Sequence, residues 1–391
     1  MKNLTIRYGV TQVAYWAAYS GTASFAATYL LGRGLSSSMV GILLAAGGLL
    51  SCASQPVLAS FADRSHRFLL VRMLLMMSAI CCGCFAALLI PGLPMGAVGI
   101  FYMVAIWSSD AMVPLLNALN VAYDQAGYTI NYGVGRGLGS AASGLSAMAF
   151  GFIIAKLGTT WMILILVSFR VLSIFVLAGY PRIVKPEVSE KEEDLSCSML
   201  HFFLRYRWYS VSLLGVLLLA MYHAMTENYL IAIMERLGGD SSHVGIALFI
   251  SAFMAAPVLF FFNKVRRIIT DNWIFRIAAL SFLIKAVLFY FAKSISVIYL
   301  LQLIQITSYA FLSPIQLYYA RAKIMDSDMV KGQAFITAAY ALGCSAGNFA
   351  GGQILNLGVD ALLFSGILMA LGGTVIIFLT VNRWDIAPKS I

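Results

Sequence analysis

Apolar runs of about 20 to 25 residues recur along the whole chain and are separated by short polar segments. About 20 helical residues cross the hydrocarbon layer of a membrane, so runs of this length predict transmembrane helices. Ten-residue stretches of alternating polarity, which would indicate a membrane barrel, are absent from the sequence. The pattern predicts an all-α membrane protein with twelve transmembrane helices, over residues 8–31, 38–61, 68–90, 96–119, 136–156, 160–180, 209–233, 243–263, 273–292, 296–318, 333–356 and 361–381.

One polar segment, residues 181–207, is longer than the others and divides the chain nearly in half. It contains the charged run 190–194, which is typical of a solvated linker. We therefore predict an N-terminal six-helix bundle over 1–180, a cytoplasmic linker over 181–207 and a C-terminal six-helix bundle over 208–391. The segment Pro56-Val-Leu58 and the basic loop after it have a counterpart half a chain later at Pro257-Val-Leu259, which indicates two pseudo-symmetric bundles.

Composition supports a membrane location, since 61% of the residues are hydrophobic and 11% are charged, against about 25% in soluble domains. The net charge of +10 does not indicate nucleic-acid binding, because the basic residues lie between the apolar runs. If both termini and the linker lie on one side, that side holds 20 of the 26 basic residues. The bias predicts cytoplasmic termini. We read the first apolar run as a retained helix and expect a multi-pass protein of the plasma membrane, here a bacterial inner membrane.

Six cysteines are present, and all but Cys197 lie within apolar runs, as buried small hydrophobic residues do. The cluster Cys81-Cys82-Gly-Cys84 has no neighbouring histidine or carboxylate that would complete a metal site. We therefore expect neither a metal nor a cofactor. The sequence also shows no nucleophile with a base and an orienting group, so we predict no catalytic residues.

Ionisable side chains at membrane depth are costly and often functional. Asp110 shares a helix face with Trp107 and Asn117, and His223 shares one with Glu227, four residues later. Static ion pairs, a packing role for the histidine or an arginine extended to the membrane surface would explain the same residues without a transport role. The ionisable residues within the predicted helices are Asp110, Arg136, Arg170, His223, Glu227 and Lys285.

Amide and aromatic side chains also recur at helical spacing on the first and tenth predicted helices. Such stripes indicate either contacts between helices or the lining of a polar site. The two stripes are Gln12, Tyr15, Tyr19 and Thr22, and Gln302, Gln305, Tyr309 and Gln316.

The loop Ala59-Ser-Phe-Ala-Asp63-Arg64-Ser-His66-Arg67 resembles the loop between helices two and three of the major facilitator superfamily. An alanine and a histidine replace two residues that are usual there. In that family the loop is a gating hinge, and the resemblance implies this role for Asp63, Arg64 and Arg67.

A finer resemblance, to the lactose-permease-like branch of oligosaccharide and nucleoside symporters, rests on Tyr132-Gly-Val-Gly-Arg136-Gly-Leu-Gly139-Ser140, Pro114-Leu-Leu-Asn117 and Lys331-Gly-Gln333. It implies that Arg136 binds sugar hydroxyls. The sequence departs from the branch at several positions. Asn117 stands for a glutamate, Ser143 for a stacking tryptophan, Gln305 and Ser308 for a proton-coupling histidine and glutamate, and Lys285 for an arginine.

These observations predict a monomeric secondary transporter that moves a sugar, glycoside or nucleoside by alternating access with proton symport. We expect the solute to bind Tyr15, Tyr19, Trp107, Asn117, Arg136, Gln305 and Tyr309. We expect protons to be carried by Asp110, His223, Glu227 and Lys285. A proton-driven multidrug exporter of the same fold is the alternative, and a membrane-embedded enzyme is a third, less favoured hypothesis.

Overall fold

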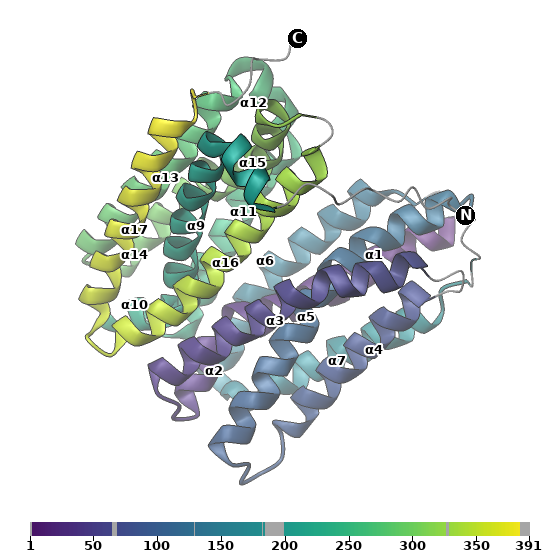
Figure 1. Cartoon of the computed structure of the whole chain (residues 1–391). Helices are drawn as coiled ribbons and strands as arrows, with labels where there is room; N and C mark the ends of the chain where they lie inside the picture. The colour runs from purple at the N-terminus through teal and green to yellow at the C-terminus, as the bar shows by residue number, and fades with distance from the viewer. Residues whose placement is uncertain are drawn as a thin grey trace. The chain divides into compact units, whose positions relative to one another are not determined.

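The computed structural model describes residues 2–64, 69–128, 130–181, 183, 199–325 and 328–383, and every regular element within these ranges is a helix (Figure 1). Contacts divide the chain into two compact units. Unit 1 comprises Met1–Val188 together with Asn228–Ala252, and unit 2 comprises Ser189–Glu227 together with Phe253–Ile391. The segment Asn228–Ala252 thus packs with the N-terminal half, whereas the boundaries of the two six-helix bundles stay a prediction.

Unit 1 is a bundle in which α1 packs on α6 and α7, and α5 packs on α3 and α4. Its helices are α1 (Lys2–Ser24), α2 (Ala26–Gly32), α3 (Ser37–Arg64), α4 (Leu69–Ala87), α5 (Met95–Gln125), α6 (Tyr132–Leu157), α7 (Thr159–Ala178), α10 (Leu230–Arg236) and the first part of α11 (Ser241–Phe260).

In unit 2, α13 packs on α15 and α17, and α15 packs on α16. Its helices are α8 (Met199–Arg205), α9 (Arg207–Asn228, which reaches the unit boundary), α12 (Phe262–Ile268), α13 (Asp271–Phe291), α14 (Ile295–Leu301), the 3-10 helix η1 (Gln302–Ile306), α15 (Tyr309–Lys323), α16 (Met329–Leu355) and α17 (Val359–Thr380). The last part of α11 also belongs to this unit.

Ten spans among the described residues are long and apolar enough to cross a membrane. The two remaining predicted spans, 8–31 and 333–356, are also helical, as α1 with α2 and as α16. Range 8–31 contains Gln12 and many hydroxyl-bearing side chains, and range 333–356 contains four amide side chains; these polar groups lower the average hydropathy. The prediction of an all-α membrane protein is confirmed, and helices occupy all twelve predicted ranges.

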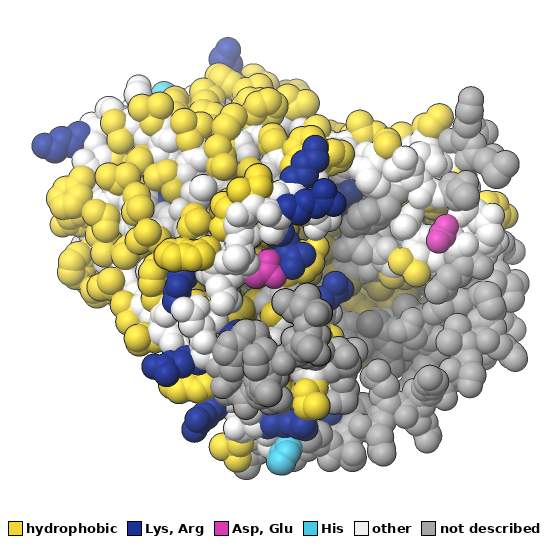
Figure 2. Space-filling view, turned by 90° about the horizontal axis from the view of Figure 1, so that it is seen from above, with side chains coloured by type: hydrophobic (Ala, Val, Ile, Leu, Met, Phe, Trp, Pro, Cys, Tyr) yellow, Lys and Arg dark blue, Asp and Glu magenta, His cyan; other side chains and the backbone are white. Residues whose placement is uncertain are grey.

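Basic residues lie at several helix ends of unit 2, and Figure 2 shows Lys and Arg side chains gathered on one face among hydrophobic ones. Arg205 ends α8, Arg266 and Arg267 end α12, and Arg321 and Lys323 end α15. This distribution fits the positive-inside pattern in the sequence. That this face is cytoplasmic stays a prediction.

Glycines allow two helices of unit 2 to approach closely. A β-carbon at Gly347 of α16 would lie 2.8 Å from the Cα of Met221 in α9, and Gly343 faces the backbone at Leu217 in the same way. Close helix packing of this kind stabilises membrane helices, because lipid offers no hydrophobic driving force for their association.

We expect Gly347→Ala to lower the melting temperature of the purified protein, because the added methyl group meets backbone atoms that cannot rotate away. Overpacking costs about 1–3 kcal/mol. Gly83→Ala in α4 is the matched control, since its β-carbon meets nothing within 4 Å and alanine favours helix. An unchanged melting temperature in Gly347→Ala would contradict the packing described for α9 and α16.

The start of α11 is capped by Asp240. Its Oδ1 accepts hydrogen bonds from the backbone N–H of Ser242 at 2.9 Å and of His243 at 3.4 Å, and from the Ser242 hydroxyl at 2.5 Å. The hydrogen bond from the Ser242 side chain is the largest cause that lowers the pKa of Asp240 to about 2. A carboxylate is favourable here, because it satisfies N–H groups that lack a partner within the helix.

The lowered pKa makes the contribution of Asp240 dependent on pH. A depressed folded-state pKa stabilises the protein above the unfolded value of 3.8, and this stabilisation is lost as the pH falls through about 2. We expect Asp240→Asn, which keeps the cap but not the charge, to melt slightly below the parent protein at neutral pH. The difference between their melting temperatures should shrink below about pH 4. A constant difference down to the lowest usable pH would show that the charge has no role in the cap.

Candidate functional site

Three aromatic side chains of α1 form a cluster in unit 1. Tyr15 stacks on Tyr19 with ring centroids 5.8 Å apart, and Trp16 meets the edges of both rings at 5.2 Å. Tyr15 is fully buried, and its hydroxyl donates to the Ser109 carbonyl of α5 at 2.7 Å. Tyr19 and Trp16 are only half-buried, so part of each side chain is accessible.

Arg136 of α6 lies over this cluster. Its Cζ is 4.2 Å from the centroid of the Trp16 ring, a cation–π contact, and its Nη1 donates to the Ser140 hydroxyl at 3.0 Å. The Trp16 Nε1 donates to the Gln12 Oε1 at 2.8 Å. A β-carbon at Gly139 would lie 2.6 Å from Trp16 Cδ1, so this glycine makes room for the indole. The arginine stays half-buried and retains donors for a ligand.

The predicted residues of α5 have different partners. Trp107 donates from Nε1 to the Ser54 hydroxyl of α3 at 3.0 Å, and half-buried Asp110 is hydrogen-bonded to Tyr19 of α1. Asn117 is exposed. Trp107 and Asp110 therefore each link α5 to a neighbouring helix.

Arg170 of α7 is fully buried and lies within electrostatic range of Asp110. Its Nη2 donates to the Ser109 hydroxyl at 2.6 Å, and its Cζ lies 5.4 Å from the Tyr15 ring centroid. Its Nε has no hydrogen-bond partner. Arg170 is a buried positive charge of unit 1, and its charge acts on Asp110 although no ion pair joins the two among the described residues.

Lys285 of α13 is the centre of a polar cluster in unit 2. Only 1% of its side chain is exposed, and Nζ donates to Gln302 Oε1 at 2.9 Å, to Gln305 Oε1 at 3.1 Å and to Glu227 Oε1 at 3.3 Å. The three acceptors match the three donors of an ammonium group. The half-buried carboxylate of Glu227 is the negative charge that makes this burial tolerable.

The backbone of the tenth predicted helix explains how both glutamines reach the same lysine. The chain changes there from α14 to η1 and resumes as α15 at Tyr309. In a 3-10 helix the side chains at i and i+3 are aligned. Gln302 and Gln305 are three residues apart within η1 and therefore point to the same side.

His223 belongs to the same unit but lies beside this charge cluster. Its ring stacks on Tyr309 with centroids 5.1 Å apart and an interplanar angle of 17°, and it meets Phe282 at 5.8 Å. Glu227 pairs with Lys285, and among the described residues no hydrogen bond joins it to His223. The histidine and tyrosine together present a flat, half-buried aromatic surface.

The structure thus brings the predicted residues into two clusters, one in each unit. Asn117 lies at the exposed surface apart from these contacts, and Asp63, Arg64 and Arg67 lie outside the residues whose side chains are described. Sequence reasoning did not select Trp16, although its spacing from Gln12 and Tyr19 places it beside the stripe on α1. It treated Arg170 as structural, and only the contact with Ser109 and the proximity of Asp110 connect it with the cluster.

Metal chemistry finds no support in these clusters. Among the described residues, no group of three or more His, Cys, Asp or Glu side chains could hold a metal ion.

Two bundles of membrane-spanning helices with buried polar clusters define a multi-pass membrane transporter of the major facilitator type. A family model confirms this class, and the chain belongs to the MFS_1 like family, which matches residues 5–365. Its family and its structural neighbours are transporters rather than enzymes. A search of curated proteins found no match.

Solved structures show the same fold at low sequence identity. A mutant of the nucleoside transporter NupG has a TM-score of 0.84 and 11% identity, over 97% of this chain and 100% of that one. NupG without the mutation gives 0.78 and 11%, over 97% and 98%. A POT family transporter in complex with 5-aminolevulinic acid gives 0.70 and 13%, over 96% of each chain.

The energetic interaction between Lys285 and Glu227 can be tested with single and double variants. We expect Lys285→Met to destabilise the protein by about 3–5 kcal/mol, because it leaves a carboxylate without its cation. Glu227→Gln should cost less, and the double variant should be more stable than Lys285→Met alone. Thermal melting in detergent measures all three, with Lys293→Met at an exposed position as control. Strictly additive effects would show that the two side chains do not interact energetically.

Proposed function

We propose that this transporter is a proton-coupled symporter for a small polar solute that carries a ring, with nucleosides favoured over sugars and glycosides. The observation that carries the proposal is the half-buried Arg136 lying on the face of Trp16 in unit 1. A cation held on an aromatic surface offers hydrogen-bond donors and a stacking face at one place.

The chemistry of the unit 1 cluster fits a nucleoside. The half-buried rings of Trp16 and Tyr19 offer aromatic surface against which a base can pack, and Arg136 can donate to ribose hydroxyls or to base carbonyls. Tyr15 is buried and committed to Ser109, so we assign it a supporting role beneath these rings. A sugar would use the same donors but less of the aromatic area. The similarity to a nucleoside transporter supports the fold that this proposal requires.

We propose that unit 2 also contacts the solute and that it couples proton binding to transport. His223 and Tyr309 provide a second aromatic surface, and Gln305 faces Lys285. Protonation of Glu227 would remove the negative partner of Lys285 and release its ammonium group from one of three contacts. A titratable ion pair of this kind can link proton binding to a rearrangement of the helices that carry it.

Asp110 is the second proposed proton carrier. It is half-buried at the centre of α5, and its hydrogen bond to Tyr19 connects it with the aromatic cluster. A carboxylate is costly in a closed, dry state of the carrier, so protonation before reorientation would lower that barrier. Arg170 would moderate the cost as a fixed positive charge within range.

We expect proteoliposomes with purified protein to accumulate labelled nucleosides when an inward proton gradient is imposed. Asp110→Asn should abolish accumulation above equilibrium but leave solute exchange measurable. Asp124→Asn, at the exposed end of the same helix, is the matched control and should accumulate normally. Accumulation by Asp110→Asn equal to that of the parent would contradict the assigned role.

Arg136→Gln tests the solute site separately. We expect it to weaken solute binding at least tenfold, about 1.4 kcal/mol, since hydrogen bonds to a charged group contribute about 1.5–3 kcal/mol.

The same proteoliposomes also test the alternative function, multidrug export. Proton-driven export of cationic dyes without nucleoside or sugar uptake would instead indicate a multidrug exporter, for which the methionine and phenylalanine content is suitable.

A further inference from the structure

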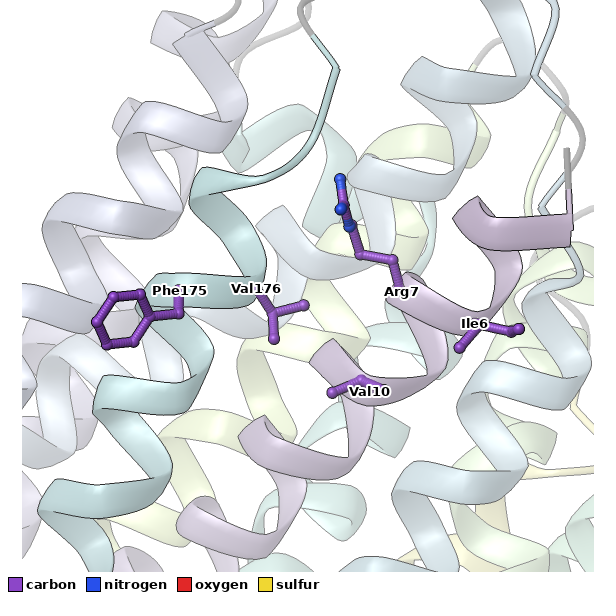
Figure 3. Close-up of a pocket in the computed structure, with 5 residues that line it drawn as sticks. All are labelled: Ile6, Arg7, Val10, Phe175 and Val176. Atoms are coloured by element: carbon purple, nitrogen blue, oxygen red, sulfur yellow. The ribbon is translucent and has the colours of Figure 1, made fainter.

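A groove on the side of unit 1, between α1 and α7, lies apart from the polar clusters. It has a volume of about 460 Å³ and is lined by Ile6, Arg7, Val10, Phe175 and Val176 (Figure 3). The lining residues belong to the first turns of α1 and the last turn of α7, so the groove lies near one surface of the membrane. Its volume lies within the range of small-molecule sites, about 300–1,000 Å³.

Four of the five lining side chains are apolar and belong to membrane helices. Phe175 is 73% exposed and Ile6 is 64% exposed, although both are large hydrophobic residues. In Figure 3, Val10 and Val176 point toward one another across the space between the helices, whereas the guanidinium of Arg7 extends along one end of it. The groove therefore has an apolar body and a cationic end.

Arg7 is a half-buried cation, and no carboxylate lies within ion-pair distance of it among the described residues. Its Cζ lies 5.9 Å from the Tyr180 ring centroid, a weak contact. A β-carbon at Gly179 would lie 3.1 Å from the Arg7 Cζ, so the glycine after α7 leaves room for the guanidinium. The Thr11 hydroxyl donates to the Arg7 carbonyl and contacts the Tyr180 hydroxyl. These contacts connect the backbone at Arg7 with Tyr180, which follows α7.

We propose that this groove binds an anionic phospholipid. The headgroup phosphate pairs with Arg7, and one acyl chain lies between Val10 and Val176. Guanidinium groups bind phosphate by paired hydrogen bonds, and a cation at the membrane boundary is stabilised by such a partner. A soluble anion would leave the apolar walls uncovered, and a zwitterionic lipid would supply no net charge for Arg7, so charge and polarity together favour the anionic lipid.

The test uses the full chain, delipidated in detergent and incubated with phosphatidylglycerol or phosphatidylcholine, with bound lipid counted by native mass spectrometry. We expect preferential retention of phosphatidylglycerol. Arg7→Gln should weaken it about five- to tenfold, since one basic residue near an anionic headgroup contributes about 1 kcal/mol or somewhat more. Arg7→Lys should keep part of the affinity. Arg33→Gln, at another half-buried arginine of unit 1, should bind like the parent.

Two further measurements distinguish binding of the acyl chain in the groove from charge attraction alone. Val176→Trp, which fills the groove and keeps Arg7, should also lower phosphatidylglycerol retention, and inorganic phosphate at millimolar concentration should not displace the lipid. Melting temperatures within the range of the parent show that the variants are folded. Any of four results would overturn the proposal. Arg7→Gln could retain as much phosphatidylglycerol as the parent, or Arg7→Gln and Arg33→Gln could lose the same amount. Val176→Trp could bind phosphatidylglycerol like the parent, or inorganic phosphate could displace the lipid.

Discussion

A charge within the hydrocarbon layer must find its partners inside the protein, and this constraint shapes unit 2. The ammonium group of Lys285 is satisfied by acceptors from α9 and η1, so a single side chain connects three segments of the unit. The 3-10 segment favours this arrangement, because it aligns the two glutamines on one side. Removing any acceptor would leave part of a buried charge without compensation, which is costly at low dielectric.

Unit 1 meets the same constraint in a different way. Arg170 is enclosed by Ser109 and Tyr15, whereas Arg136 is held on the surface of Trp16 and stays half-buried. The first arginine is fully buried and is not accessible to a ligand, and the second retains donors at a half-buried position. Burial therefore separates the two arginines, and it supports the proposal that Arg136 is the one that contacts the solute. Charge alone does not distinguish them, whereas the family resemblance in the sequence implied a solute-binding role for Arg136 only.

Much of the fold was predictable from the sequence, because the lengths of the apolar runs are set by membrane thickness and are insensitive to packing details. The predicted ranges 38–61 and 160–180, for example, correspond closely to α3 and α7. The interruption at η1 was not predictable, because hydropathy is the same for a continuous and a broken helix. The Glu227–Lys285 pair could not be predicted from the sequence either, since it joins residues 58 positions apart whose contact depends on tertiary structure. Sequence spacing instead suggested His223 as the neighbour of Glu227.

The glycine at position 139 constrains how the aromatic cluster of unit 1 could vary. Because the indole of Trp16 occupies the volume that a methyl group would need, residue 139 and residue 16 cannot vary independently. A larger residue on α6 would demand a smaller ring on α1, and the surface that carries the guanidinium of residue 136 would shrink with it. Redesign of the proposed solute site would therefore begin with positions 16 and 139 rather than with Arg136.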